Sequence, residues 1–312
     1  MTHLGKHIKL MNLLLAAVIL ESIALAGLLI WIGSAPDSAP DPPASEPEQQ
    51  FPPEKQPPAD ELTAPEILNR SSIIAHGMGA IMDTKILNCM EGFREQYDKG
   101  VRVFEVDLRL TADQRVVLRH DWRAGWQEGI SETAIPTLEE FRSKPLLEQY
   151  TPLSFQDLLL LMEEYPDICI VTDTKFIDAE VVTLQFEAML QDARELGLSY
   201  LFNRIAIQVY NPLMFRVVDN IYPFPWYIYT LYMVGFAQTE EDFREKADFC
   251  TENGIMAITM GASLWSAEYA PLAEQYGLRI YTHTVNDPEQ ARALLASGVA
   301  GVYTDILTPD SL

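Results

Sequence analysis

The sequence predicts an α/β fold, a (β/α)8 TIM barrel with an antiparallel hairpin after its second strand. Two observations predict it. Short apolar runs alternate with amphipathic helical segments from Ser71 onward, and eight such units fit into about 240 residues. This alternation is typical of a parallel sheet that closes into a barrel. One transmembrane helix and a Pro-rich linker are expected ahead of the barrel.

The membrane helix is predicted from an almost uninterrupted apolar run at residues 10–32. A helix of that length spans a hydrocarbon core of ~30 Å. Lys6 and Lys9 precede the run and Asp37 follows it, so the positive-inside rule predicts a cytoplasmic N-terminus and an extracytoplasmic barrel. A cleaved signal peptide is the alternative, because small residues follow the run.

The segment between the apolar run and the barrel is rich in Pro, Glu, Asp and Ser and has no apolar periodicity. Such a composition cannot bury enough surface to fold and gives an extended spacer. We therefore expect an N-terminal tail and signal anchor over residues 1–33, a disordered linker over 34–65 and the TIM-barrel domain over 66–312.

The barrel elements follow in chain order. The eight parallel strands are expected at Ile73–His76, Val103–Leu108, Ile168–Thr172, Ile205–Val209, Tyr227–Tyr232, Met256–Thr259, Ile280–Thr284 and Gly301–Thr304. The helices are expected at Leu87–Lys99, Leu153–Tyr165, Glu180–Leu196, Pro212–Asn220, Glu240–Glu252, Ser266–Tyr276 and Asp287–Ser297, several of them closed by a glycine. The turn at residues 111–114 is too short for a parallel crossover, so Val116–Arg119 must return antiparallel.

Composition narrows the class of protein. The formal net charge of −23 argues against binding to nucleic acid, whose phosphates need basic patches. The three cysteines, Cys89, Cys169 and Cys250, form no CxxC pair, which argues against a zinc site. The sequence leaves open whether two of these cysteines form a disulfide bond.

Two carboxylates stand at i and i+2 in the second strand, Glu105 and Asp107. Alternate residues of a strand share one face, so the two carboxylates repel each other unless a positive charge lies between them. A hard divalent cation such as Mg²⁺ or Ca²⁺, which prefers oxygen ligands, is one solution. A surface hairpin with solvated acids is the other.

Polar residues also stand where other strands end. Active sites of TIM barrels lie at the C-terminal ends of the strands. The residues expected there are His76, Glu105, Asp107, His120, Asp173, Lys175, Gln208, Asn211, His283, Asn286 and Asp305. Their convergence on one end predicts a single site with acids, histidines and a lysine.

Five segments carry a resemblance to a known family: AHGMG (75–79), FEVDLRLTADQRVVLRHD (104–121), TDTK (172–175), IQVYNP (207–212) and HTVNDPEQARALLASGVAGVYTD (283–305). Together they resemble the glycerophosphodiester phosphodiesterase family, whose members are metal-dependent phosphodiesterase barrels. The resemblance implies an acid/base pair of His76 and His120. It implies a divalent-cation site of Glu105, Asp107 and Asp173, with Lys175 on the phosphate side.

Three positions depart from the family pattern. Gly77 stands where the family has an arginine after the first histidine, and Leu87 where it has a glutamate that binds metal. His283 replaces a tryptophan, either as a pocket residue or as a packing substitute. A Glu-Asp-Asp site without the fourth acid is similar to the sphingomyelinase D-like branch of the superfamily. Substrate-binding residues are expected to be Lys175, His283 and Gln208.

The sequence thus predicts a membrane-anchored, extracytoplasmic, metal-dependent phosphoric diester hydrolase. Its substrates would be glycerophosphodiesters or phospholipid head groups, and its partners the membrane, through the N-terminal helix, but not nucleic acid. Two alternatives stay open. One is a phospholipase D-like lipid enzyme, suggested by the missing glutamate, and the other is a catalytically decayed barrel that binds an envelope ligand.

Overall fold

A computed structural model describes residues 51–122, 135–233 and 235–312 of the chain. The predicted signal anchor (1–33) and the first part of the predicted linker lie outside the described residues. Within those ranges, no helix combines the length and the apolar character that crossing a membrane requires.

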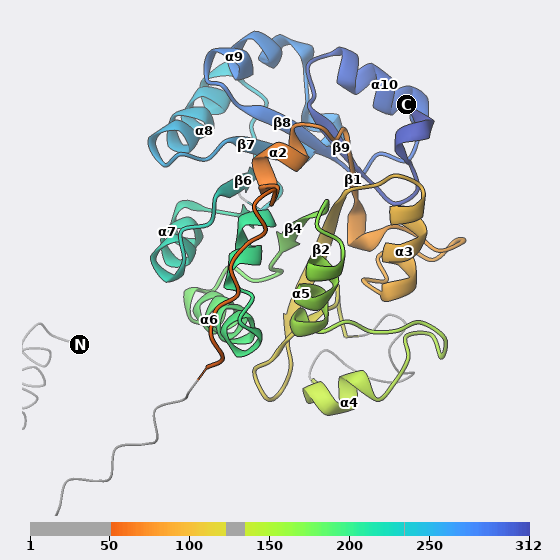
Figure 1. The fold of residues 1–312 in the computed structure, drawn as a ribbon. Helices are drawn as coiled ribbons and strands as arrows, with labels where there is room; N and C mark the ends of the chain where they lie inside the picture. Colours follow the sequence, from red (N-terminus) through yellow and green to blue (C-terminus); the bar gives the residue numbers. More distant parts are fainter. Residues whose placement is uncertain (1–50, 123–134, 234) are drawn as a thin grey trace, which may run out of the picture. The chain divides into compact units, whose positions relative to one another are not determined.

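In the part of the chain that the structure describes, eight parallel strands close into a barrel, as predicted (Figure 1). Neighbouring strands follow the order β1-β9-β8-β7-β6-β5-β4-β2, and the pairing of Ala75 with Phe104 closes the ring between β1 and β2. The strands are β1 (Ile73–Ala75), β2 (Val103–Leu110), β4 (Cys169–Asp173), β5 (Ile205–Val209), β6 (Trp226–Thr230), β7 (Ala257–Gly261), β8 (Arg279–His283) and β9 (Gly301–Thr304).

Helices surround the strands in Figure 1 and bury their apolar stripes against them. Local signals fix the ends of several: Ser154 and Asp157 form a reciprocal capping box at the start of α5, and Gly197 ends α6 in the left-handed conformation, with φ 66°. The outer helices are α3 (Met90–Asp98), α5 (Phe155–Glu164), α6 (Ala179–Leu196), α7 (Pro212–Ile221), α8 (Glu240–Glu252), α9 (Ala270–Gln275) and α10 (Pro288–Ala296).

The predicted hairpin is present: β3 (Val116–Leu118) pairs antiparallel with the end of β2. The Arg119 N–H donates to the Asp107 carbonyl over 2.8 Å, and the Arg109 guanidinium donates to the His120 carbonyl over 2.9 and 3.0 Å. These bonds place His120 beside the Asp107 segment of β2, because β3 starts opposite Leu110 and runs back past Leu108.

Two helices differ from the sequence expectation. The irregular stretch after the hairpin contains a short helix, α4 (Leu138–Arg142), which Thr137 and Glu140 cap reciprocally. The single helix expected at Ser266–Tyr276 is divided into a 3₁₀ turn at Ala267–Tyr269 and α9, with Pro271 in the first turn of α9. A proline favours the first turn of a new helix over the interior of a continuous one.

The segment ahead of β1 also differs from the expectation, because the linker was predicted to be disordered up to residue 65. Residues 51–63 run along the barrel and α2 (Ala64–Leu68) follows them (Figure 1). The Lys55 N–H donates to the Gly197 carbonyl over 2.8 Å, and Glu61 accepts from the Arg204 guanidinium over 2.6 Å. Tertiary contacts of this kind order a segment whose composition alone predicts disorder.

Helix α2 closes the N-terminal end of the barrel. Its buried residues Ile67 and Leu68 form one apolar cluster with first residues of several strands, among them Val103, Cys169 and Trp226. The C-terminal strand ends therefore remain as the open end of the barrel. All three cysteines of the chain are buried and free, so the disulfide left open by the sequence is not formed.

Candidate active site

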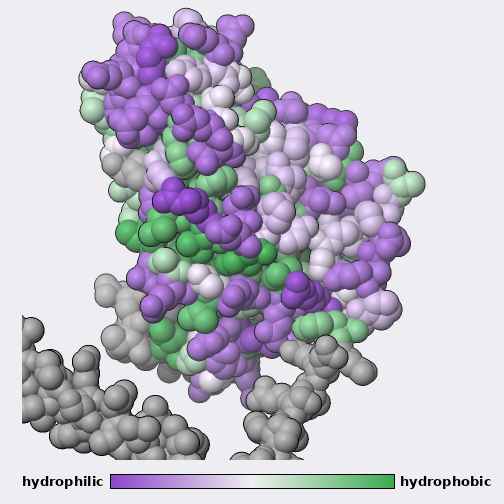
Figure 2. Space-filling model, turned by 90° about the vertical axis from the view of Figure 1, so that its left-hand side faces the viewer, coloured by the Kyte–Doolittle hydropathy of each residue, from purple (hydrophilic) through white to green (hydrophobic). Residues whose placement is uncertain are grey.

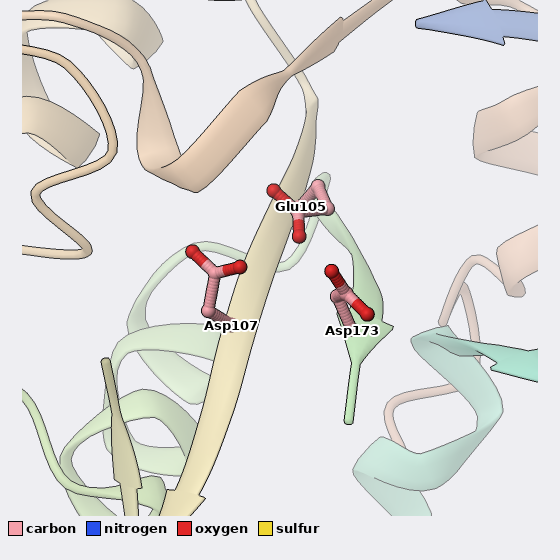
Figure 3. Close-up of side chains that lie close together, drawn as sticks. All are labelled: Glu105, Asp107 and Asp173. Carbon is pink, nitrogen blue, oxygen red and sulfur yellow. The ribbon is translucent and has the colours of Figure 1, made fainter. Parts of the chain in front are cut away.

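Three buried carboxylates meet at the C-terminal ends of β2 and β4. One ligand oxygen from each of Glu105, Asp107 and Asp173 lies within 4.8 Å of the others, and Figure 3 shows the three side chains turned towards one another. Register explains the approach, because Asp107 pairs with Asp173 across the two parallel strands. Burial, and next the charge of Asp107, raise the pKa of Glu105 to about 8. Burial and neighbouring carboxylates thus outweigh the opposing charges of His76 and Lys175, so negative charge exceeds positive charge in this site.

Hydrogen bonds fix the orientation of these carboxylates. The Gly77 N–H donates to Glu105 Oε2 over 2.6 Å. Asn88 donates from Nδ2 to Asp107 Oδ2 over 2.7 Å and accepts from the Asp107 N–H over 2.9 Å. Asp173 Oδ1 is buried and has no hydrogen-bond partner among the described residues. This oxygen thus keeps a lone pair that can serve as a ligand for a cation.

Lys175 brings one positive charge to the acids. Its backbone is left-handed, with φ 58°, and its ammonium lies 2.7 Å from Asp107 Oδ1 and contacts Asp173. Burial lowers the pKa of Lys175, but the charges of Asp107, Asp173 and Glu105 outweigh it and leave that pKa raised. One ammonium does not balance three carboxylates. The surplus of buried negative charge and the all-oxygen donor set fit a hard divalent cation.

His76 is held by a second carboxylate network. Its Nδ1 lies 2.8 Å from Asp305 Oδ1, and Asp305 also accepts from Asn286 over 2.6 Å and pairs with Lys85 over 2.9 Å. Burial lowers the pKa of His76, but the Asp305 hydrogen bond and the charges of Glu105 and Asp107 raise it to about 9. His76 is therefore protonated at neutral pH. Its Nδ1–H donates to Asp305, and its Nε2–H can donate a proton to a bound substrate.

His120 approaches from the hairpin. Its Nδ1 lies 2.9 Å from Asp121 Oδ2, and its side chain is more exposed than that of His76, at 43% against 20%. A carboxylate at Nδ1 favours the tautomer that leaves Nε2 as an acceptor. The two histidines thus stand in one pocket in different environments.

The pocket has a volume of about 250 Å³ and two unlike walls. The residues from β1, β2, the hairpin and the segment after β4 are ionisable: His76, Glu105, His120, Asp173 and Lys175. The residues from β5, β6, β8, β9 and the loops after them carry amides, hydroxyls and rings: Gln208, Tyr210, Thr230, Tyr232, His283 and Tyr303. The described pocket therefore divides into a charged wall and an aromatic wall.

The structure brings the sequence-predicted residues together. Seven of the eight, His76, His120, Glu105, Asp173, Lys175, Gln208 and His283, line the pocket, and Asp107 is fully buried within the acid cluster. Gln208 accepts from the Tyr303 hydroxyl over 3.1 Å and donates to the Thr172 carbonyl over 3.2 Å. His283 lines the pocket rather than serving only as packing.

Several residues of the site have no assigned role in the sequence prediction. Asn88 orients Asp107, and Asp305 orients His76, although Asp305 was expected at the same end of the barrel. Tyr210 and Tyr303 stand inside the segments IQVYNP and GVYTD, which carry part of the family resemblance. Their place next to strand ends is the signal that could have found them.

Two departures from the family pattern have a clear structural setting. Gly77 has φ 54°, and a Cβ there would lie 2.6 Å from the Ile86 Cα, so the left-handed turn that aims its N–H at Glu105 leaves no room for a side chain. Leu87 is buried in an apolar cluster with Val117 and Phe141. It adds no acid to the site, and the neighbouring Asn88 reaches Asp107 instead.

The sequence profile of the glycerophosphoryl diester phosphodiesterase family matches residues 79–308. The chain belongs to this family. It is accordingly a phosphoric diester hydrolase, and the matched range holds every predicted site residue except His76. A search of curated protein sequences finds no match.

Solved structures share the barrel. A glycerophosphodiester phosphodiesterase from Parabacteroides distasonis has a TM-score of 0.61 and 16% identity, over 77% of this chain and 94% of that one. A phosphodiesterase from Oleispira antarctica, in complex with the product sn-glycerol-3-phosphate, has a TM-score of 0.59 and 14% identity, over 75% and 93%. At these identities the likeness establishes a common fold.

Proposed function

We propose that the protein hydrolyses glycerophosphodiesters with the help of one divalent cation, Mg²⁺ or Ca²⁺. The observation that carries the proposal is the position of the buried acids Glu105, Asp107 and Asp173 in the same site as His76, His120 and Lys175. The solved relative that holds sn-glycerol-3-phosphate supports the choice of substrate class.

The three carboxylates would hold the cation. A bound divalent cation polarises a phosphoryl oxygen and neutralises charge on the phosphate. The free Asp173 Oδ1 and the oriented Glu105 and Asp107 provide oxygen ligands for it. Lys175, which is charged and lines the pocket, can turn from the carboxylates to a second phosphate oxygen.

The histidines carry the proton transfers. In this mechanism His120 accepts a proton from the attacking water, whose oxygen forms a bond to phosphorus. The phosphorus–oxygen ester bond breaks, and His76 gives its proton to the departing alcohol oxygen. Asp305 keeps the His76 ring in place and charged before the transfer. General acid–base catalysis of this kind contributes about 10²–10⁴-fold to a rate.

The test is hydrolysis of glycerophosphoglycerol by chelator-treated protein with and without added Mg²⁺ or Ca²⁺, followed by assay of glycerol 3-phosphate. We expect activity only with metal, a loss of about 10²-fold or more in His76→Ala, and loss of the metal response in Asp173→Asn. Asp98→Asn, which removes an equal charge from the exposed end of α3, should behave as the wild type. Full activity of His76→Ala, or none in the wild type with either metal, would overturn the proposal.

The location of the enzyme is a second part of the proposal. We infer that residues 10–32 anchor the chain in a membrane with the barrel on the extracytoplasmic side; the length of the apolar run and the flanking charges support this. Protease protection of tagged chains in sealed membranes tests it: a barrel digested only from the cytoplasmic side would refute the inference.

The phospholipase D-like alternative keeps one observation in its favour, the apolar residue at Leu87. Product analysis of a lysophospholipid separates the two candidates. A released head-group alcohol indicates the alternative reaction, whereas turnover of soluble glycerophosphodiesters alone favours the main proposal.

A further inference from the structure

Large apolar side chains are exposed around the open end of the barrel. Among the residues that the structure describes, twelve large hydrophobic side chains are exposed, and half of them lie between the C-terminal end of a strand and the first turn of the helix that follows it. The C-terminal ends of parallel strands meet at one end of a barrel, so these residues lie around the pocket. We call them the apolar rim: Met82, Ile177, Leu213, Tyr232, Met233 and Ile306.

Two contacts show how the rim adjoins the pocket. The Ala80 N–H donates to the Asp305 carbonyl over 2.7 Å, so the loop that carries Met82 lies beside the segment after β9. The Tyr232 ring lies edge to face against the ring of His283, which lines the pocket, with centroids 6.3 Å apart. The rim therefore borders the pocket entrance, and the hydrolytic mechanism uses none of its residues.

The rim segments differ in charge from the closed end of the barrel. Segments 231–239, 262–267 and 306–309, which follow β6, β7 and β9, contain no Asp, Glu, Lys or Arg. At the closed end, Arg70, Arg102 and Asp167 stand just ahead of strands. Figure 2, which shows the side of the molecule that carries α7 and α8, has a band of hydrophobic side chains between hydrophilic areas. Exposed apolar side chains that gather in this way mark a surface for contact with a partner.

A lipid bilayer is the partner that this rim fits. Exposed apolar side chains insert into the boundary between head groups and acyl chains, where tyrosine is also enriched. The net charge of −23 opposes an anionic surface, whose attraction for a protein depends on lysine and arginine. A zwitterionic surface, such as phosphatidylcholine, causes no such repulsion. Apolar contact with a zwitterionic bilayer is therefore the favoured mode of binding.

The chain ahead of the barrel points to the same partner. The apolar run at residues 10–32 has the length of a membrane anchor, and residues 33–50 separate it from Phe51. A chain of that length reaches at most about 60 Å, which exceeds the diameter of about 45–50 Å of a compact domain the size of residues 51–312. The tether is thus long enough to let the open end turn towards the membrane that holds the anchor, and it raises the local concentration of lipid around the rim.

We propose that the apolar rim docks the open end of the barrel on the surface of a zwitterionic lipid bilayer. Docking is a second membrane contact of the chain, in addition to the anchor inferred for residues 10–32, and it does not depend on the hydrolase function. It turns the pocket towards the interface between lipid and water.

The experiment compares two methionines of equal exposure at opposite ends of the barrel, Met233 in the rim at 46% and Met256 ahead of β7 at 45%. Each is replaced in the full chain, by Met233→Cys or Met256→Cys, and labelled with an environment-sensitive fluorophore. The three native cysteines are buried, so the label attaches to the introduced one. In phosphatidylcholine vesicles that carry a nitroxide in the upper acyl chain, the label at 233 should lose about half of its emission or more, because an interfacial apolar face lies about 5–10 Å deep in the boundary of head groups and acyl chains. The label at 256 should keep its emission.

Leu213→Ser, with the label at 233, should lower the ratio of docked to undocked barrel about 5-fold or more, because it removes a large apolar side chain from the contact. Leu160→Ser is the matched control, since Leu160 is exposed to a similar extent on the outer helix α5 and lies outside the rim.

Equal quenching of both labels, or none at 233, overturns the docking. A ratio unchanged by Leu213→Ser also overturns it, and so does tighter docking on vesicles that contain phosphatidylglycerol, which would show an electrostatic contact. None of these measurements requires turnover, so failure of the proposed function, seen as no hydrolysis of glycerophosphoglycerol, is a separate result.

Discussion

Asp305→Asn should lower the pKa of His76 without changing the shape of the site. The carboxylate of Asp305 accepts from His76 Nδ1 over 2.8 Å, and an amide oxygen can take the same place. The substitution removes the charge that favours the imidazolium. It also removes the ion pair with Lys85, whose ammonium is half exposed and can turn to solvent.

The size of the shift follows from the hydrogen bond. A bond that involves a charged group contributes about 1.5–3 kcal/mol, against about 0.5–1.5 kcal/mol for a neutral one. The difference of about 1–1.5 kcal/mol corresponds to about one pKa unit. The pKa of His76 should therefore fall from about 9 by about one unit in Asp305→Asn. Addition of Mg²⁺ to the wild type should also lower it, because the cation neutralises Glu105 and Asp107.

The assay is an NMR titration of the imidazole signals in metal-free protein, with His76 assigned by the signal lost in His76→Gln. The chain has five histidines, which keeps the spectrum simple. Asp310→Asn, an exposed change of the same charge, serves as the control and should leave the titration unchanged. A His76 pKa that stays near 9 in Asp305→Asn would show that Asp305 does not set it.

Three further predictions concern stability. Glu61→Gln should reduce the free energy of unfolding by about 3 kcal/mol in urea, because it leaves the buried Arg204 guanidinium without its carboxylate; an unchanged midpoint would show that the pair contributes little. Gly77→Ala should cost about 1–3 kcal/mol, since alanine is strained at φ 54° and its Cβ meets the Ile86 backbone; a protein as stable as the wild type would contradict the turn geometry. Folding lowers the pKa of His283 from 6.5 to about 4, so the unfolded chain binds a proton more readily between these pH values. The free energy of unfolding should therefore fall by up to about 3 kcal/mol as the pH falls from 6.5 towards 4. His283→Asn should show less of this fall in urea unfolding at several pH values, and the same pH dependence in variant and wild type would refute the assignment.

The barrel was predictable because its strands are short and almost wholly apolar. β5 and β9 begin and end at the predicted residues, and the other strands differ by a few residues at their ends. Helix α2 was not predictable from its composition. Its five residues are too few for a stable isolated helix, and the burial of Ile67 and Leu68 under the barrel holds it in place.

The charged wall of the site was predictable from position along the chain, whereas only Gln208 and His283 of the aromatic wall were predicted and its three tyrosines were not. Glu105, Asp107 and Asp173 lie at strand ends that a parallel barrel must bring together. The pairing of His76 with Asp305 joins positions 229 residues apart, and the parallel pairing of β1 with β9, Ala75 with Thr304, brings them together. The direction of the Tyr232 side chain depends on how the chain turns after β6, and the pattern of apolar residues does not predict that turn.

The attachment of residues 51–63 and α2 to the closed end of the barrel has a practical consequence. Material fused or immobilised ahead of Phe51 joins the molecule on the side away from the pocket, so a bead or fusion partner at that position leaves substrate entry unobstructed. A truncated enzyme that starts at residue 66 would lose Glu61, which pairs with Arg204, and Thr63, which caps α2. A truncated enzyme should therefore start at residue 51.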